Sequence, residues 1–255
     1  MRTLAIALNT FREAIRNQIL YSILFFAVLV VGVAAILGAA SIGDQIKFVK
    51  DFSLMAISLF GVVIAIVLGV NLLQKELGRR TILNILSKPV ARWEFLAGKF
   101  MGLFATLCLV VTLMCTALIL VLAAFEGGLD YGLLLASFTA LLELMIIVAV
   151  ALFFSSIVVT PTLAGLFTAA TFIAGRCCGY IHFILGHQYS DTAKAVARSV
   201  YWTLPHLYKF NIADQVVYGD RIDPSYLAAL VLYAVSYTGV LLALSIVLFS
   251  RREFA

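Results

Sequence analysis

Residues 75–102 read KELGRRTILNILSKPVARWEFLAGKFMG and connect two long apolar runs. This segment holds six of the eighteen Lys and Arg residues of the chain. Only 12% of the 255 residues are charged and 64% are hydrophobic, whereas a soluble domain carries about 25% charged residues. We therefore predict that most of the chain lies in a bilayer and that residues 75–102 form a basic loop between two membrane helices.

Six apolar runs on the two sides of this loop are long enough to cross a bilayer, which takes about 20 residues. They are 19–40, 53–73, 100–124, 131–158, 161–181 and 226–250. A bilayer core offers no water to backbone groups, so each run is predicted to be a helix. The predicted fold class is an all-α polytopic membrane protein with one transmembrane domain, residues 1–255, and an even number of spans puts both termini on one side.

The basic residues predict which side that is. The side with the termini holds eleven of them: Arg2, Arg12, Arg16, Lys75, Arg79, Arg80, Lys88, Arg92, Lys99, Arg251 and Arg252. The opposite side holds six, four of them in the long loop after the fifth run. By the positive-inside rule, the termini and the 74–99 loop are predicted to be cytoplasmic.

The N-terminal segment, residues 1–18, is predicted to be an amphipathic helix. Its apolar residues recur at helical spacing on one face: Leu4, Leu8, Phe11 and Ile15. One interpretation is a helix lying in the cytoplasmic membrane interface. The alternative is a continuation of the first span into the headgroup layer.

Within the basic loop, residues 80–87 have a helical pattern with one apolar face, made by Ile82, Leu83, Ile85 and Leu86. Pro89 ends this helix, because its ring removes a backbone donor and restricts the residue before it. A short amphipathic helix of this kind can insert into a groove on a soluble protein. The alternative is a solvated basic connection that only sets topology.

Gly98 and Gly102 form a G-x-x-x-G pattern where the third run begins. Small residues at this spacing let two membrane helices approach closely. We therefore predict that both glycines pack against another helix.

Residues 182–224 form the only long segment predicted on the external side. A short helix is predicted over 191–202, and the aromatic residues of the segment suit the membrane–water interface. Loops of this length are usually functional. The segment is too short for a separate domain, and it either caps an exit path or re-enters the outer leaflet.

Two charged residues lie inside predicted spans. Glu143, near the middle of the fourth run, costs about 2.5–3.5 kcal/mol to insert, so it is predicted to face the bundle or a wet cavity. Its role is either in the translocation path or in a structural hydrogen bond. Arg176, near the external end of the fifth run, either extends to the interface or pairs with an acidic group. Cys178 and His182 have the spacing of soft metal ligands, but Cys is also common as a small hydrophobe in helices, and no metal site is assigned.

The 75–99 loop resembles the loop between the second and third helices of ABC-2 type transporter permeases. Ten residues match the pattern of that family: Glu76, Gly78, Thr81, Leu86, Ser87, Pro89, Val90, Arg92, Gly98 and Lys99. The Arg79-Arg80 insertion and Ala91 depart from it. Residues 204–211, LPHLYKFN, resemble a second segment of these permeases, most closely in the branch that accompanies nitrous-oxide-reductase maturation.

The resemblance implies the non-catalytic permease subunit of an exporter in a prokaryotic plasma membrane, which is the inner membrane in a Gram-negative cell. Two copies pair as a homodimer, and each docks a separate ATPase through residues 80–88. The residues implied in this coupling are Glu76, Gly78, Thr81, Ile82, Ile85, Leu86, Lys88, Pro89 and Arg92.

The chain has no G-x-x-x-x-G-K-[ST] motif, so we expect ATP and Mg²⁺ on the partner and no cofactor on this subunit. No nucleic-acid partner is expected, because the basic residues are explained by topology. An ion-coupled secondary carrier and an intramembrane enzyme are the alternatives, although neither an internal repeat nor a known catalytic motif is visible.

Overall fold

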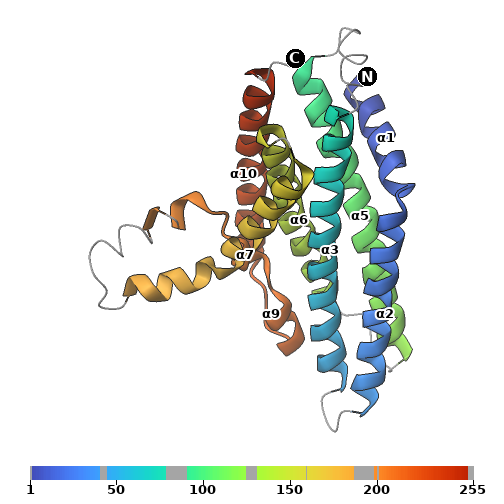
Figure 1. The fold of residues 1–255 in the computed structure, drawn as a ribbon. Coiled ribbons are helices and arrows are strands. Elements are labelled where there is room, and N and C mark those ends of the chain that lie inside the picture. The colour runs from blue at the N-terminus through green and yellow to red at the C-terminus, as the bar shows by residue number, and fades with distance from the viewer. Residues whose placement is uncertain are drawn as a thin grey trace.

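The computed structural model describes residues 2–40, 45–78, 91–124, 131–158, 160–186, 198–199 and 201–251. Within these ranges the named elements are all helical (Figure 1). They are α1 (Arg2–Ile15), α2 (Gln18–Ala40), α3 (Gln45–Gly78), α5 (Arg92–Ala124), α6 (Tyr131–Ile157), α7 (Pro161–Gly186), η1 (Leu207–Phe210), α9 (Ala213–Tyr218) and α10 (Pro224–Arg251).

Six of these helices, α2, α3, α5, α6, α7 and α10, are long and apolar enough to cross a membrane. The predicted all-α fold with six spans is therefore confirmed. The helices extend beyond the predicted apolar runs: α3 begins at Gln45 rather than at 53, α5 begins at Arg92 rather than at 100, and α7 continues to Gly186, although its apolar part ends at Tyr180, close to the predicted 181. Hydropathy detects only the apolar part of a helix, whereas the helices continue through polar residues beyond it.

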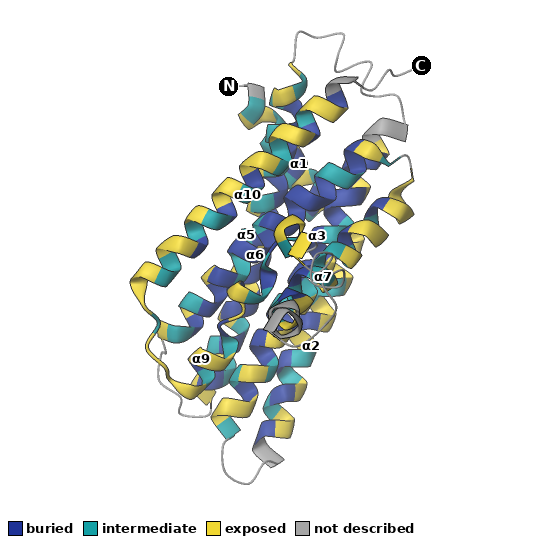
Figure 2. Ribbon diagram, turned by 90° about the vertical axis from the view of Figure 1, so that its left-hand side faces the viewer, coloured by how far each residue is buried: buried dark blue, intermediate teal, exposed yellow. Residues whose placement is uncertain are grey.

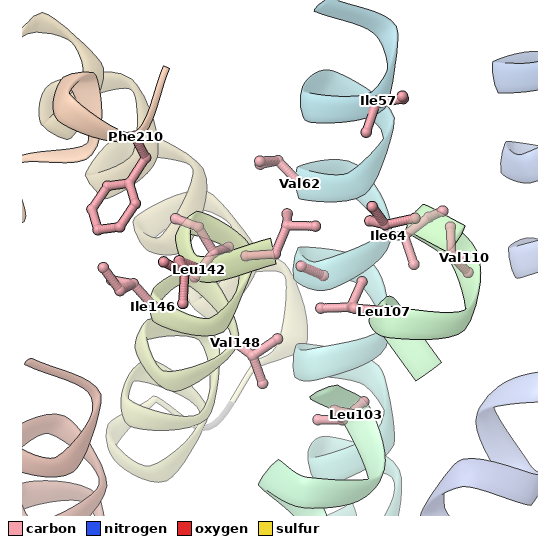
Figure 3. Packing of buried hydrophobic residues seen from close by; sticks show 14 of the residues in the cluster. Ile57, Val62, Ile64, Leu103, Leu107, Val110, Leu142, Ile146, Val148 and Phe210 are labelled. Atoms are coloured by element: carbon pink, nitrogen blue, oxygen red, sulfur yellow. The ribbon is translucent and has the colours of Figure 1, made fainter. Parts of the chain in front are cut away.

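The centre of the bundle is α3, which packs against α2, α5, α6 and α7. Figure 3 shows Ile64 of α3 beside Val110 of α5, with Leu142 and Ile146 of α6 on the other side of α3. All four side chains are buried. The outer faces of the bundle are largely exposed and rich in large apolar side chains, as expected of surfaces that face lipid (Figure 2).

Both chain ends lie at one end of the bundle. Figure 1 shows the start of α1 and the end of α10 at the same end as the last turn of α3 and the first turn of α5. An even number of spans requires this arrangement. The assignment of that end to the cytoplasm stays a prediction.

The helix α1 is separated from α2 by a turn at Arg16 and Asn17, and the Asn17 Oδ1 atom accepts a hydrogen bond of 3.0 Å from the Ile19 backbone N–H. It packs against α5 with Thr10 and Ala14 buried. Of the predicted apolar face, Leu4 and Leu8 are exposed, whereas Phe11 and Ile15 are half-buried. A position in the membrane interface stays a prediction.

The glycines of α5 lie directly against α1. A Cβ atom on Gly98 would be 2.8 Å from the Ile6 Cβ atom, and one on Gly102 would be 2.5 Å from the Ala7 carbonyl oxygen. Separations under about 3 Å do not occur for real Cβ atoms. The two helices can approach this closely only because both positions are glycine.

Candidate functional site

The segment after α7 folds back onto the helices of the bundle. Leu207 and Phe210, three residues apart in η1, are 0% and 1% exposed, since positions i and i+3 of a 3₁₀ helix share a face. Figure 3 shows Phe210 beside Leu142 and Ile146 of α6. η1 contacts α6 and α7, and α9 contacts α3 and α6. Neither η1 nor α9 was predicted; of the predicted 191–202 helix, residues 191–197 and 200 lie outside the described residues.

Two glycines of α7 make room for this segment. A Cβ atom on Gly175 would lie 2.7 Å from the Pro205 carbonyl oxygen, and one on Gly179 would lie 3.3 Å from the ring of Tyr208. They form a second G-x-x-x-G pattern, which could have been read from the sequence but was missed. The segment after α7 therefore packs on α7 through direct contact with its backbone.

Beneath this segment lies an ion pair that joins three helices. Glu143 of α6 has a side chain 2% exposed, and its Oε1 atom accepts a hydrogen bond of 2.8 Å from Nε of Arg176 on α7. The Arg176 Nη2 atom donates to the Glu143 Oε2 atom at 3.0 Å and to Oγ of Ser58, on α3, at 2.6 Å. Of the two alternatives for Arg176, pairing with an acidic group is therefore the one observed.

A pocket of about 370 Å³ opens beside the ion pair, between α3, α7 and the start of α9. Its polar lining comes from Asp51, Ser58, Arg176, Asn211 and Asp214, and its apolar lining from Met55, Leu59, Phe172 and Ala213. A smaller cavity of about 20 Å³ lies deeper, against Glu143 itself. That volume is about the size of one water molecule.

The charges of Glu143 and Arg176 pair directly inside the bundle. The bidentate geometry satisfies both charges inside a low-dielectric bundle and fixes α6 to α7. In the described part of the chain, no group of three or more His, Cys, Asp or Glu residues is placed to hold a metal ion. His182 lies at the described end of α7, but its side chain is not described.

Most of the residues implied in ATPase coupling cannot be placed. Thr81, Ile82, Ile85, Leu86, Lys88 and Pro89 lie outside the described residues. Glu76 and Gly78 belong to the last turn of α3. Arg92 begins α5, and its Nη1 atom donates a hydrogen bond of 2.8 Å to the Phe249 carbonyl oxygen near the end of α10.

The segment after α7 also contains a histidine, His206, whose protonation depends on pH near neutrality. The Tyr233 hydroxyl lies 3.0 Å from the His206 backbone nitrogen and 3.2 Å from its Nδ1 atom, and the Tyr201 ring packs against it with centroids 4.3 Å apart. The His206 Nε2 atom is buried without a hydrogen-bond partner among the described residues. Burial first, and the charge of Lys209 second, lower the pKa of His206 below its ordinary value of 6.5.

Acidification is therefore expected to loosen residues 201–210. A lowered pKa in the folded state means that neutral His206 contributes stability above about pH 6.5, which is lost as the pH falls through the lowered pKa. Amide hydrogen exchange of this segment should accelerate between about pH 7.5 and about pH 5, after correction for intrinsic exchange. The variant His206→Gln should show no such acceleration, and equal pH dependence in both proteins would contradict the assignment.

The described part of the chain is a six-helix membrane bundle with a polar pocket beside a buried ion pair. A family model described as ABC-2 family transporter protein matches residues 4–254, nearly the whole chain. The chain therefore belongs to the ABC-2 transporter family and is a multi-pass membrane permease of an ABC transporter. No curated protein matches it. Its place in the nitrous-oxide-reductase branch stays a prediction.

Proposed function

We propose that this permease exports its substrate as a homodimer and is driven by a separate ATPase that docks on residues 80–88. The observation that best supports this coupling is the place of the segment along the chain. It stands between α3, which ends at Gly78 and forms the centre of the bundle, and α5, which begins at Arg92. A displacement of this short segment is therefore passed directly to two spans.

The path from the segment to the ion pair runs through α3. Ser58 of α3 accepts a hydrogen bond from Arg176, so tilting α3 pulls on the contact between α6 and α7. Arg92 passes the movement of α5 to the end of α10. In the proposed cycle, ATP binding closes the ATPase dimer, residues 80–88 move, and the spans part to open a path between two permease copies. Glu143 and Arg176 then line that path.

The homodimer and the export direction rest on the resemblance to permeases that work in pairs and mostly export. Inside-out vesicles that hold the permease and its ATPase test the direction. ATP-dependent accumulation of substrate inside such vesicles indicates export, whereas ATP-dependent loss from loaded vesicles indicates import.

Replacing Leu86 with aspartate is expected to weaken ATPase binding by about thirtyfold or more, because a buried apolar anchor of a docking helix becomes a charge. Affinity of the purified permease for its ATPase measures this. Asn84→Asp is the matched control, since it adds the same charge on the polar side of the same segment. If both variants bind the ATPase as tightly as the parent protein, the proposed docking helix is wrong.

A further inference from the structure

A second and larger pocket, of about 850 Å³, lies far from the ion pair. It is formed where α1 ends, α2 begins and α3 approaches its last turn. Most of the residues that line it are polar or charged: Asn9, Arg12, Glu13, Arg16, Asn17, Gln18, Asn71 and Lys75, beside the apolar Ile19 and Leu72. Nothing in the proposed transport cycle uses these residues together.

The pocket carries an excess of positive charge. Its carboxylate, Glu13, is already engaged: Oε1 accepts from Lys75 Nζ at 2.8 Å, and Oε2 lies 3.9 Å from the Nζ atom of Lys99, a side chain 1% exposed. Arg12 and Arg16 are exposed, and neither side chain forms a hydrogen bond or an ion pair with another described residue. Two guanidinium groups are therefore available to an anion, and guanidinium forks bind phosphate oxygens in pairs.

The level of the pocket along the bundle indicates the source of that anion. The apolar span of α2 begins at Gln18 and that of α3 ends at Lys75, and both residues line the pocket. This level along the bundle is the boundary between hydrocarbon and headgroups. On α2, Ile19 at the edge of the pocket is 47% exposed, and Tyr21 further along the helix is 53% exposed. A ligand with an anionic head and apolar tails can contact both the basic pocket and the exposed apolar side chains of α2.

We propose that this pocket binds the anionic headgroup of a phospholipid from the leaflet on the side of the chain termini. The phosphate contacts Arg12 and Arg16, amide groups such as that of Asn71 bind the polar remainder, and the acyl chains follow α2. A bound lipid then holds α1 and α2 against the end of α3 that leads into residues 80–88. Lipid binding in this pocket does not require the ATPase and can be tested on the permease alone.

Native mass spectrometry of the detergent-purified permease with phosphatidylglycerol or phosphatidylcholine tests the proposal. Retention of phosphatidylglycerol is expected to exceed that of phosphatidylcholine. The double variant Arg12→Gln/Arg16→Gln should bind phosphatidylglycerol about thirtyfold more weakly, about five- to sixfold for each arginine. The matched control Arg198→Gln/Arg221→Gln removes two exposed arginines elsewhere in the chain and should bind as the parent does.

Two further variants separate the pocket from general charge and from folding defects. Arg12→Lys/Arg16→Lys keeps the charges that orient the chain and should retain most of the binding. Asn71→Phe keeps every charge but places a bulky apolar side chain in the pocket from α3. This variant should lose phosphatidylglycerol binding. Unchanged binding in Arg12→Gln/Arg16→Gln or in Asn71→Phe would overturn the proposal. Displacement of the lipid by inorganic phosphate at equal concentration would also overturn it, because the site would then serve a soluble anion.

Discussion

Replacing Arg176 with methionine is expected to lower the free energy of unfolding by about 3–5 kcal/mol, the usual cost of leaving one member of a buried ion pair without its partner. Glu143 is 2% exposed, so its charge keeps little access to bulk water when the guanidinium is gone. Ser58 Oγ, 3.4 Å from the Glu143 Oε2 atom, is too weak a donor to replace it. Denaturation of the purified permease in detergent, compared with the parent protein, measures the loss.

Replacing the other member of the pair, Glu143→Gln, is expected to lower the free energy of unfolding by less, about 1–2 kcal/mol. Arg176 is 24% exposed beside the 370 Å³ pocket and lies over the Phe172 ring at 5.6 Å, so its charge keeps access to polar surroundings. The double variant Glu143→Leu/Arg176→Met should regain most of the stability lost in Arg176→Met, since an apolar pair of similar size can replace a buried ion pair. A double variant as unstable as Arg176→Met alone would contradict this account.

The same double variant separates the two roles left open for Glu143. If the pair serves only to join α6 and α7, the stable apolar variant should transport at close to the parental rate. If the pair lines the translocation path, the variant should fold but lose substrate-stimulated ATPase activity in the complex. Stability and transport therefore report on different hypotheses in one protein.

The helical spans could be predicted because bilayer insertion is decided locally. An apolar run such as 131–158 has no other way to satisfy its backbone in lipid, and α6 occupies residues Tyr131–Ile157. The ends of α3 and α5 were harder to predict, because helix continuation through Lys47 or Glu94 depends on capping and contacts rather than on hydropathy. The Glu94 carboxylate, for example, accepts a hydrogen bond of 3.1 Å from the Ala91 backbone N–H at the start of α5.

The sequence predicted the burial of Glu143 in the candidate site but not the partners of its carboxylate. The cost of a carboxylate in a membrane predicted that Glu143 faces inward, and it does. Its partners Arg176 and Ser58 lie 33 and 85 residues away, so the pairing depends on how α6, α7 and α3 are rotated about their axes. The seating of η1 on Gly175 likewise follows from tertiary packing, although the small-residue spacing was available to read.

Replacing Gly102 with valine is expected to displace α1 from α5. The new Cβ atom would lie 2.5 Å from the Ala7 carbonyl oxygen and 2.7 Å from the Thr10 Cβ atom, and helix backbone cannot retreat as a flexible side chain can. Overpacking of this kind typically costs about 1–3 kcal/mol. Because α1 packs mainly against α5 and buries Thr10 and Ala14, hydrogen exchange of α1 should rise more than that of α6.

Gly239→Val in α10 is the matched control, because a Cβ atom there would have nothing within 4 Å. It makes the same change of helix propensity without the steric conflict, so the difference between the two variants isolates the α1–α5 contact. Equal stability and equal exchange of α1 in both variants would show that α1 is not held by Gly102. A selective loss at Gly102 would instead establish that α1 belongs to the packed bundle at this end, where α5 begins after residues 80–88, and that any movement of this segment must carry α1 with it.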